Sequence, residues 1–183
     1  MEKLINFKIN DKYKCIDGLT LKIIAIISMF IDHAGRLLFS DEIIMLIIGR
    51  LAFIIFAFLA VEGFEKTSNL RKYELRMLIF GLISEIPFDL GFFGKPIRWQ
   101  HQNVFFELFL GLVTLELMYK GKPKNTITKL LIMFVSCYIA TKCRLDYSAF
   151  GILLMVLFYV HKNEIVPQTI GGLGLSFLSS SIE

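Results

Sequence analysis

The sequence has 183 residues, of which 55% are hydrophobic and 20% charged, with a formal net charge of +4 and a mean hydropathy of +0.64. A soluble domain carries about 45–50% apolar and about 25% charged residues. These values argue against a soluble enzyme and predict a polytopic membrane protein, because so much apolar surface is hard to cover in water. In such a protein, basic residues report orientation first, so we expect no nucleic-acid partner.

Apolar segments follow one another along the chain, separated by charged loops. A helix needs roughly 20 residues to cross about 30 Å of hydrocarbon. Six segments are predicted to span the membrane as helices: 19–39, 43–64, 75–93, 104–119, 127–141 and 149–161. The predicted fold class is therefore an all-α transmembrane helix bundle.

A last apolar segment, 165–178, is rich in Ser and Gly and contains a proline, so it is a doubtful or truncated seventh span. Residues 1–18 form a basic N-terminal segment that precedes the first span. Residues 19–183 are predicted to make one transmembrane domain.

The distribution of Lys and Arg predicts the orientation of the bundle. With the N-terminus inside, the inner segments carry 12 basic residues and the outer loops four. The positive-inside rule therefore favours a cytoplasmic N-terminus.

With this orientation, polar side chains from five spans lie in the outer half of the membrane. They are Asp32, His33, Arg36, Arg50, Glu85, Asp89, Gln102, Asn103, Glu107, Asp146 and Tyr147. Such residues are rare in spans and are functional by default. We expect them to form a catalytic and substrate-binding site.

The first span carries an Asp-His pair and an arginine. Asp32 and Arg36 are one helical turn apart and are expected to pair, which leaves His33 to transfer a proton or accept an acyl group. The alternative is a structural ion pair, with His33 hydrogen-bonded to a neighbouring helix.

Glu85 and Asp89 share one face of the third span, around Pro87. Two carboxylates on one face offer a general base or a site that orients an amine. The alternative is a structural network in which these acids pair with Arg36, Arg50 or Arg98.

On the cytoplasmic side, residues 61–77 combine four bases with Gly63, Thr67 and Ser68. Glu62, Arg71 and Arg76 are the candidate cofactor-binding residues, since arginine holds phosphate oxygens in a bidentate manner. The alternative is that this basic loop serves topology alone. The sequence contains no Walker loop, dinucleotide fingerprint or zinc helix motif, and no metal is expected.

The order of these motifs resembles the TraX family of integral membrane proteins. The matching stretches are "LKIIAIISMFIDHAGRL" (21–37), "GRLAFIIFAFLAVEGFEKTSNLRKYELRM" (49–77), "GLISEIPFDLGF" (81–92), "QNVFFELFLGL" (102–112) and "DYSAFGILLMVLFY" (146–159). The resemblance implies a bacterial inner-membrane, multi-pass protein that transfers an acetyl group, with acetyl-CoA as the donor, to the N-terminal amine of a pilin. It also implies a further C-terminal segment that these 183 residues do not show.

The sequence therefore predicts a membrane-embedded acyltransferase. It would move an acetyl or acyl group from a cytoplasmic CoA donor to an amine or hydroxyl acceptor, a small molecule or a peptide N-terminus. In this hypothesis His33, Asp32, Glu85 and Asp89 are catalytic, and the bilayer and a second copy of the chain are partners. The alternatives are a small transporter or proton-coupled carrier and a non-enzymatic membrane assembly factor.

Overall fold

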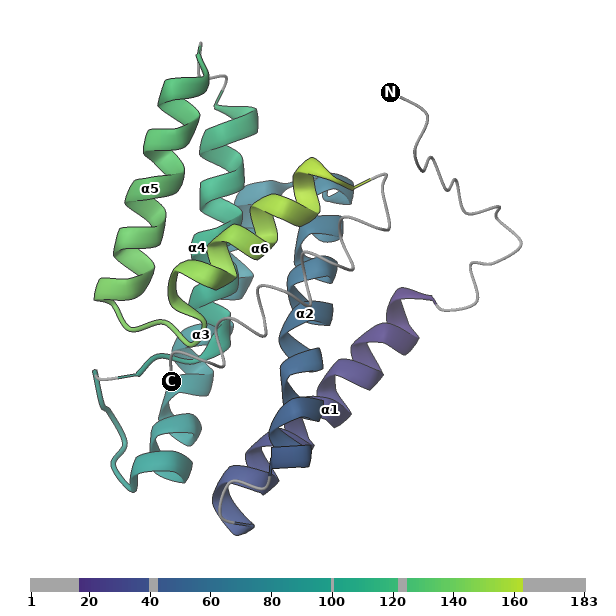
Figure 1. The fold of residues 1–183 in the computed structure, drawn as a ribbon, viewed down its shortest axis with the longest axis vertical. Coiled ribbons are helices and arrows are strands. Elements are labelled where there is room, and N and C mark those ends of the chain that lie inside the picture. The colour runs from purple at the N-terminus through teal and green to yellow at the C-terminus, as the bar shows by residue number, and fades with distance from the viewer. Residues whose placement is uncertain (1–16, 40–42, 100, 122–124, 163–183) are drawn as a thin grey trace. The chain divides into compact units, whose positions relative to one another are not determined.

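The structure, a computed structural model, describes residues 17–39, 43–99, 101–121 and 125–162, and its regular elements in these ranges are all helical (Figure 1). They are α1 (Gly18–Leu38), α2 (Ile43–Lys66), α3 (Leu70–Phe93), α4 (Val104–Leu115), the π-helical turn η2 (Glu116–Lys120), α5 (Thr126–Lys142) and α6 (Ser148–Val160). The all-α prediction is confirmed for this part of the chain.

The predicted helical segments agree with the observed helices to within a few residues. The largest difference is at α3, which begins at Leu70 rather than at residue 75. Its first turn is polar, but Asn69 caps it by accepting a hydrogen bond from the Lys72 N–H at 3.0 Å. The seventh segment, 165–178, lies outside the described residues.

Side-chain caps also mark the starts of α1 and α5. Asp17 accepts from the Thr20 N–H at 2.8 Å, and Asn125 accepts from the Thr128 N–H at 2.8 Å. Hydrogen bonds from the side chain and backbone of Thr20 hold the pKa of Asp17 below its ordinary value. α3 continues through Pro87 and ends at Gly94, whose φ of +66° suits a residue without a Cβ.

The chain divides into two compact units, one of residues 1–59 and 157–183 and the other of residues 60–156. Each unit is described by itself below. That residues 19–183 form one transmembrane domain stays a prediction.

In the first unit, α1 and α2 approach closely at two glycines. A Cβ at Gly35 would lie 2.8 Å from the Cβ of Met45, and one at Gly49 would overlap the Asp32 carboxylate. Small residues at such contacts let two helices pack at short range. Phe58 and Phe158 meet edge to face in the same unit, with their centroids 6.0 Å apart.

We expect Gly49→Ala to destabilise the first unit, because the new methyl group must displace the Asp32 side chain. Overpacking of this kind costs about 1–3 kcal/mol. Gly18→Ala is the matched control, since a Cβ there meets nothing within 4 Å. Thermal unfolding in detergent should show a lower midpoint for Gly49→Ala and no loss for Gly18→Ala. Equal midpoints would contradict the close contact.

In the second unit, α4 packs against both α3 and α5, as Figure 1 shows. Leu112 and Leu115 of α4 are fully buried, and Gly111 leaves room for the Met155 side chain of α6. A second apolar group, Ala140, Leu145 and Ile152, joins α5 to the start of α6. This packing fixes the ends of α3, α4 and α6 relative to one another.

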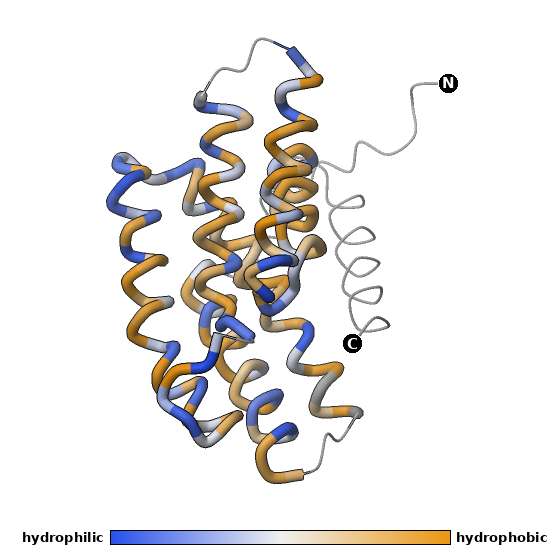
Figure 2. Tube along the Cα trace, turned by 90° about the vertical axis from the view of Figure 1, so that its left-hand side faces the viewer, coloured by the Kyte–Doolittle hydropathy of each residue, from blue (hydrophilic) through white to orange (hydrophobic). Residues whose placement is uncertain are grey.

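Many large apolar side chains are exposed along the helices. Ile83 of α3 is 62% exposed and Phe134 of α5 is 71% exposed. Figure 2 shows apolar residues along most of each helix, with hydrophilic residues concentrated at helix ends and loops. Each exposed Leu, Ile or Phe forgoes about 1.5–3 kcal/mol of burial free energy in water.

Length and hydropathy together identify one described helical stretch that suffices to cross a bilayer, Ile47–Lys66, with a mean hydropathy of 2.1. Ser148–Val160 is apolar but shorter. Charged residues inside α1 and α3 lower their hydropathy, and α5 and α6 are short for a span. The prediction of six spans is therefore not confirmed by this criterion.

Candidate functional site

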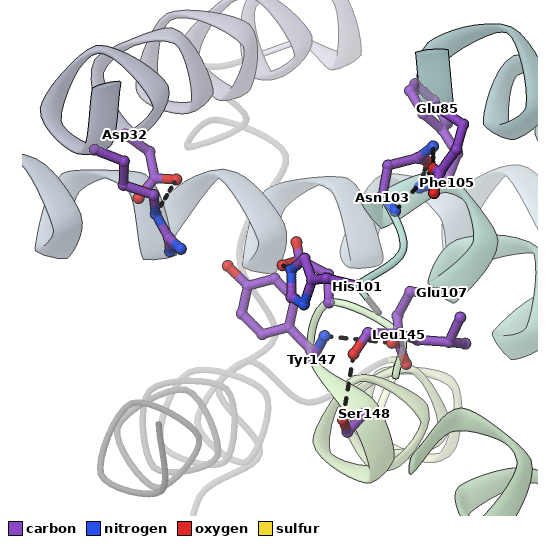
Figure 3. Close-up of polar contacts among 11 residues, drawn as sticks. Asp32, Glu85, His101, Asn103, Phe105, Glu107, Leu145, Tyr147 and Ser148 are labelled. Atoms are coloured by element: carbon purple, nitrogen blue, oxygen red, sulfur yellow. Dashed lines mark hydrogen bonds and ion pairs between the residues drawn. The ribbon is translucent and has the colours of Figure 1, made fainter. Parts of the chain in front are cut away.

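In the second unit, polar side chains gather where α3 ends and where α4 and α6 begin (Figure 3). We call this group the carboxylate cluster, and its members are Glu85, Asp89, His101, Asn103, Glu107 and Asp146. Three of its carboxylates are on helices α3 and α4, and the other members lie in the connections that enter α4 and α6. Helix ends and short loops together position the group.

Asn103 links α3 to α4. It is the N-cap of α4, and its side-chain oxygen accepts from the Phe105 N–H at 3.0 Å. Its side-chain N–H donates to the Gly81 carbonyl at 2.9 Å and to Glu85 Oε2, which also accepts from the Asn103 backbone N–H. The predicted fourth segment, 104–119, begins where α4 begins, and Glu85 is a partner of Asn103 that the sequence did not show.

We expect Asn103→Ala to lower stability more than loss of an ordinary cap does. The substitution removes the cap and one hydrogen bond each to the Gly81 carbonyl and Glu85 Oε2, which keep their other donors. A cap alone is worth typically about 1 kcal/mol, and each further hydrogen bond lost adds about 0.5–1.5 kcal/mol. Asn125→Ala at the exposed start of α5 is the matched control. Chemical or thermal unfolding in detergent measures both, and equal losses would contradict the bridging role.

Asp89 is fully buried and holds the loop that follows α3. Its Oδ2 accepts from the backbone N–H of Arg98, whose guanidinium lies 4.3 Å from the centre of the Phe93 ring. The sequence alternative paired Asp89 with an arginine side chain, but in the structure Asp89 accepts from an arginine backbone N–H. Because its partner is a backbone N–H, Asp89 fixes the conformation of the loop as well as the position of its own carboxylate.

Glu107 is fully buried on α4 and holds the start of α6. Its Oε2 accepts from the Tyr147 N–H at 3.3 Å. Gly151 makes room for this carboxyl group, because a Cβ there would overlap it. Glu107 therefore determines how the chain enters α6.

His101 and Asp146 pair across two loops, with His101 Nε2 3.1 Å from Asp146 Oδ1. The Gln102 N–H next to His101 donates to the Arg144 carbonyl at 3.0 Å. Arg144 has a φ of +53°, a strained backbone conformation that this local pairing supports. Sequence reasoning selected Gln102 and Asp146 but missed His101. Its only signal was its position immediately before Gln102.

Three carboxylates of the cluster have one buried oxygen without a hydrogen-bond partner among the described residues. These atoms are Glu85 Oε1, Asp89 Oδ1 and Glu107 Oε1. A buried acceptor without a donor is costly and indicates a bound proton, water or ligand group. In the described ranges, no three His, Cys, Asp or Glu side chains are grouped so that they could hold a metal ion.

The first unit contains the other predicted catalytic residues. Arg36 Nε lies 3.2 Å from Asp32 Oδ2, so the predicted ion pair forms on α1. His33 and Arg50 are half-buried on α1 and α2. That these residues join the carboxylate cluster in one site stays a prediction.

The predicted cofactor-binding residues lie toward the other end of the second unit from the cluster. Glu62 pairs with Lys66 at 2.6 Å on an exposed surface. Arg76 lies over the Tyr73 ring at 5.8 Å, and Tyr73 packs against Gly63. Glu62 is thus engaged locally, while the two arginines are on the exposed first turns of α3.

Sequence reasoning missed Glu74, which is only 8% exposed and precedes the predicted span 75–93. Burial raises the pKa of Glu74, and repulsion from Glu116 adds to the effect. Near it, the Lys120 ammonium donates to the Phe64 carbonyl at 3.3 Å and lies over the Phe64 ring. In the sequence, the signal for Glu74 was a single acid within the basic stretch "RKYELR".

An all-helical fold, apolar outer faces and buried carboxylates together indicate a protein associated with the membrane. The chain belongs to the TraX family, because the family described as TraX protein matches residues 17–170. The resemblance drawn from the motifs is therefore confirmed.

Two relatives show how far the similarity extends. The chain is 32% identical over 167 residues to a probable fimbrial assembly protein, FimC of serogroup H1, from Dichelobacter nodosus, covering 82% of this chain and 64% of that one. It is 29% identical over 157 residues to the uncharacterized protein RP591 of Rickettsia prowazekii (strain Madrid E), covering 79% of this chain and 55% of the relative. The chain thus spans less than two thirds of either relative. No solved structure matches it.

Proposed function

We propose that this protein is a multi-pass acyltransferase of the bacterial inner membrane. It moves an acetyl or acyl group from cytoplasmic acetyl-CoA to an amine or hydroxyl acceptor in the outer half of the membrane. The observation that carries the proposal is the carboxylate cluster, which places the fully buried Asp89 and Glu107 beside Glu85 and Asp146 in a chain of the TraX family. Carboxylates accept hydrogen bonds from an amine.

The membrane setting is supported by the exposed apolar side chains of α3 and α5. A lipid environment removes these groups from water, and six spans with a cytoplasmic N-terminus account for the excess of basic residues in the inner segments. In this orientation the ends of α3 and the starts of α4 and α6 face outward. The acceptor then approaches the carboxylate cluster from outside the cell.

The acceptor is proposed to be a peptide N-terminus of pilin type. One relative carries the name of a fimbrial assembly protein. The family resemblance implies that the acceptor is a pilin amine, exposed outside the cytoplasm after processing. Glu85 and Asp89 receive the amine, with Gln102, Asn103, Glu107, Asp146 and Tyr147 around it. His33, oriented by Asp32, accepts the acyl group or takes the proton of the acceptor, and Arg36 and Arg50 hold polar groups of the substrates.

The donor is proposed to bind at the cytoplasmic end, where Glu62, Arg71 and Arg76 lie on α2 and α3. The test is coenzyme A binding to the detergent-purified protein by calorimetry. We expect Arg71→Ala or Arg76→Ala to weaken binding by about tenfold or more, since a hydrogen bond to a charged group is worth about 1.5–3 kcal/mol.

Lys142→Ala is the matched control, because Lys142 ends α5 on the predicted outer side. It removes one positive charge but no donor contact, so binding should not change. Equal weakening in all three variants would show a general charge effect and contradict the donor site. Absence of coenzyme A binding by the wild-type protein would contradict the choice of donor.

A second candidate function is a proton-coupled carrier. The buried oxygens of Glu85, Asp89 and Glu107 favour it, because chains of intramembrane acids relay protons in transporters. Proteoliposomes separate the two functions. Proton-driven uptake without acetyl transfer would select the carrier, and acetyl transfer without uptake would select the enzyme.

A third candidate is a non-enzymatic membrane assembly factor. The name of the relative from Dichelobacter nodosus favours it. Cells that carry His33→Ala decide this alternative. If the protein is an assembly factor, the variant cells still form surface fibres. If it is the enzyme, the acceptor in the variant cells stays unmodified.

A further inference from the structure

Sequence reasoning gave no role to His101, yet the second unit places it in an ordered pair. Its Nε2 lies 3.1 Å from Asp146 Oδ1, and both side chains are about one third to one quarter exposed, at 33% and 26%. With a proton on Nε2, the ring donates to the carboxylate, and this hydrogen bond holds its orientation. A carboxylate that orients an imidazole is the arrangement that makes histidine an effective base.

Backbone hydrogen bonds of the neighbouring residues fix the positions of both His101 and Asp146. Next to His101, the Gln102 N–H donates to the Arg144 carbonyl, and Gln102 forms an isolated bridge with Leu145. Next to Asp146, the Tyr147 N–H donates to the fully buried Glu107. The pair therefore joins two loops that are each fixed at the adjoining residue. Such preorganisation is typical of a catalytic pair and exceeds what an exposed ion pair requires.

The surroundings of His101 suit a proton carrier. The Phe88 ring of α3 stacks on the imidazole, with centroids 5.9 Å apart and planes inclined at 21°. The acidic residues near the pair include Glu85 of α3 and Glu107 of α4, in addition to Asp146 itself. The Asp146 carboxylate at 3.1 Å stabilises the imidazolium that forms when the ring takes a proton.

We propose that His101, oriented by Asp146, takes the proton of an amine acceptor, and that Glu107 is the positioning residue for the pair. This inference rests on the proposed acyltransferase function and names primary amines as the acceptor class. His33 accepts the acyl group from the thioester, as in the proposed function: the C–S bond breaks, and sulfur leaves with the electron pair. The amine nitrogen then forms a bond to the acyl carbon, and the bond from that carbon to His33 breaks. The amine proton passes to His101 Nδ1, the nitrogen that does not face Asp146, and then to the thiolate.

The test measures coenzyme A release by the purified protein with acetyl-CoA and a short peptide that has a free N-terminal amine. The same peptide with an acetylated N-terminus is the substrate control. We expect His101→Ala to lower kcat by about 10²–10⁴-fold with little change in the KM for acetyl-CoA. His161→Ala is the matched control and keeps the wild-type rate. Asp146→Asn should lower kcat less than His101→Ala and change the pH profile.

Chemical rescue separates a base from a structural residue. His101 is partly exposed, so small imidazoles can reach its place. Added imidazole bases should restore His101→Ala in proportion to their basicity. A wild-type rate and pH profile in His101→Ala would overturn the inference, and so would a folded but inactive variant that no base rescues. If the wild-type protein releases no coenzyme A with either peptide, the acyltransferase proposal itself fails. Activity without dependence on His101 overturns only the inference.

Discussion

His33→Ala is expected to abolish acetyl transfer while leaving coenzyme A binding intact. Loss of a residue that carries a proton or an acyl group lowers the rate by about 10²–10⁴-fold or more. The Asp32–Arg36 ion pair beside it remains, because it is formed by side chains that the substitution does not touch. Transfer from labelled acetyl-CoA to a peptide amine, in membranes and in detergent, measures the effect.

The control for this experiment is His161→Ala, since His161 follows α6 and has no proposed role in the reaction. Asp32→Asn adds a second test, because it keeps the shape of the side chain and removes the charge that orients His33. An intermediate loss in Asp32→Asn supports orientation by the carboxylate. Unchanged transfer in His33→Ala would rule out a catalytic role for this residue.

Glu107→Ala is expected to be the most destabilising single substitution in the second unit. Glu107 is fully buried, and its removal deprives the Tyr147 N–H of its acceptor and leaves a cavity beside Gly151. An orphaned buried donor costs about 1–3 kcal/mol, and a cavity of side-chain size adds about 2–3 kcal/mol. The protein should unfold at a clearly lower temperature in detergent.

Glu107→Gln is the matched variant. Glutamine keeps one carbonyl oxygen that accepts from the Tyr147 N–H, and it fills nearly the same volume. We therefore expect most of the stability to return. If Glu107→Gln is as unstable as Glu107→Ala, the carboxyl group itself, rather than its accepting oxygen, holds the start of α6.

The helices of this protein were predictable because their signals are local. Apolar runs and the charged loops between them are recognised from neighbouring residues alone. Ion pairing of Asp32 with Arg36 was predictable for the same reason, since one helical turn brings them together. The early start of α3 at Leu70 was missed because its first turn is polar and only the Asn69 cap marks it.

The partners of the buried acids were not predictable from spacing. Asp89 is 9 residues from Arg98 but binds its backbone, and Glu107 is 40 residues from Tyr147. The same holds for the 45 residues between His101 and Asp146. Periodicity tells which residues share a face of one helix, but not which face of another helix it meets.

By itself, the sequence determined the all-α class, the positions of the helices, the TraX resemblance and most of the polar residues at the site. Local periodicity and composition carry that information. Only the tertiary structure decided that Asn103 joins Glu85, that Glu107 holds the entrance of α6 and that His101 pairs with Asp146. The physical reason is that buried polar groups must find donors and acceptors, and packing between distant segments determines which ones they meet.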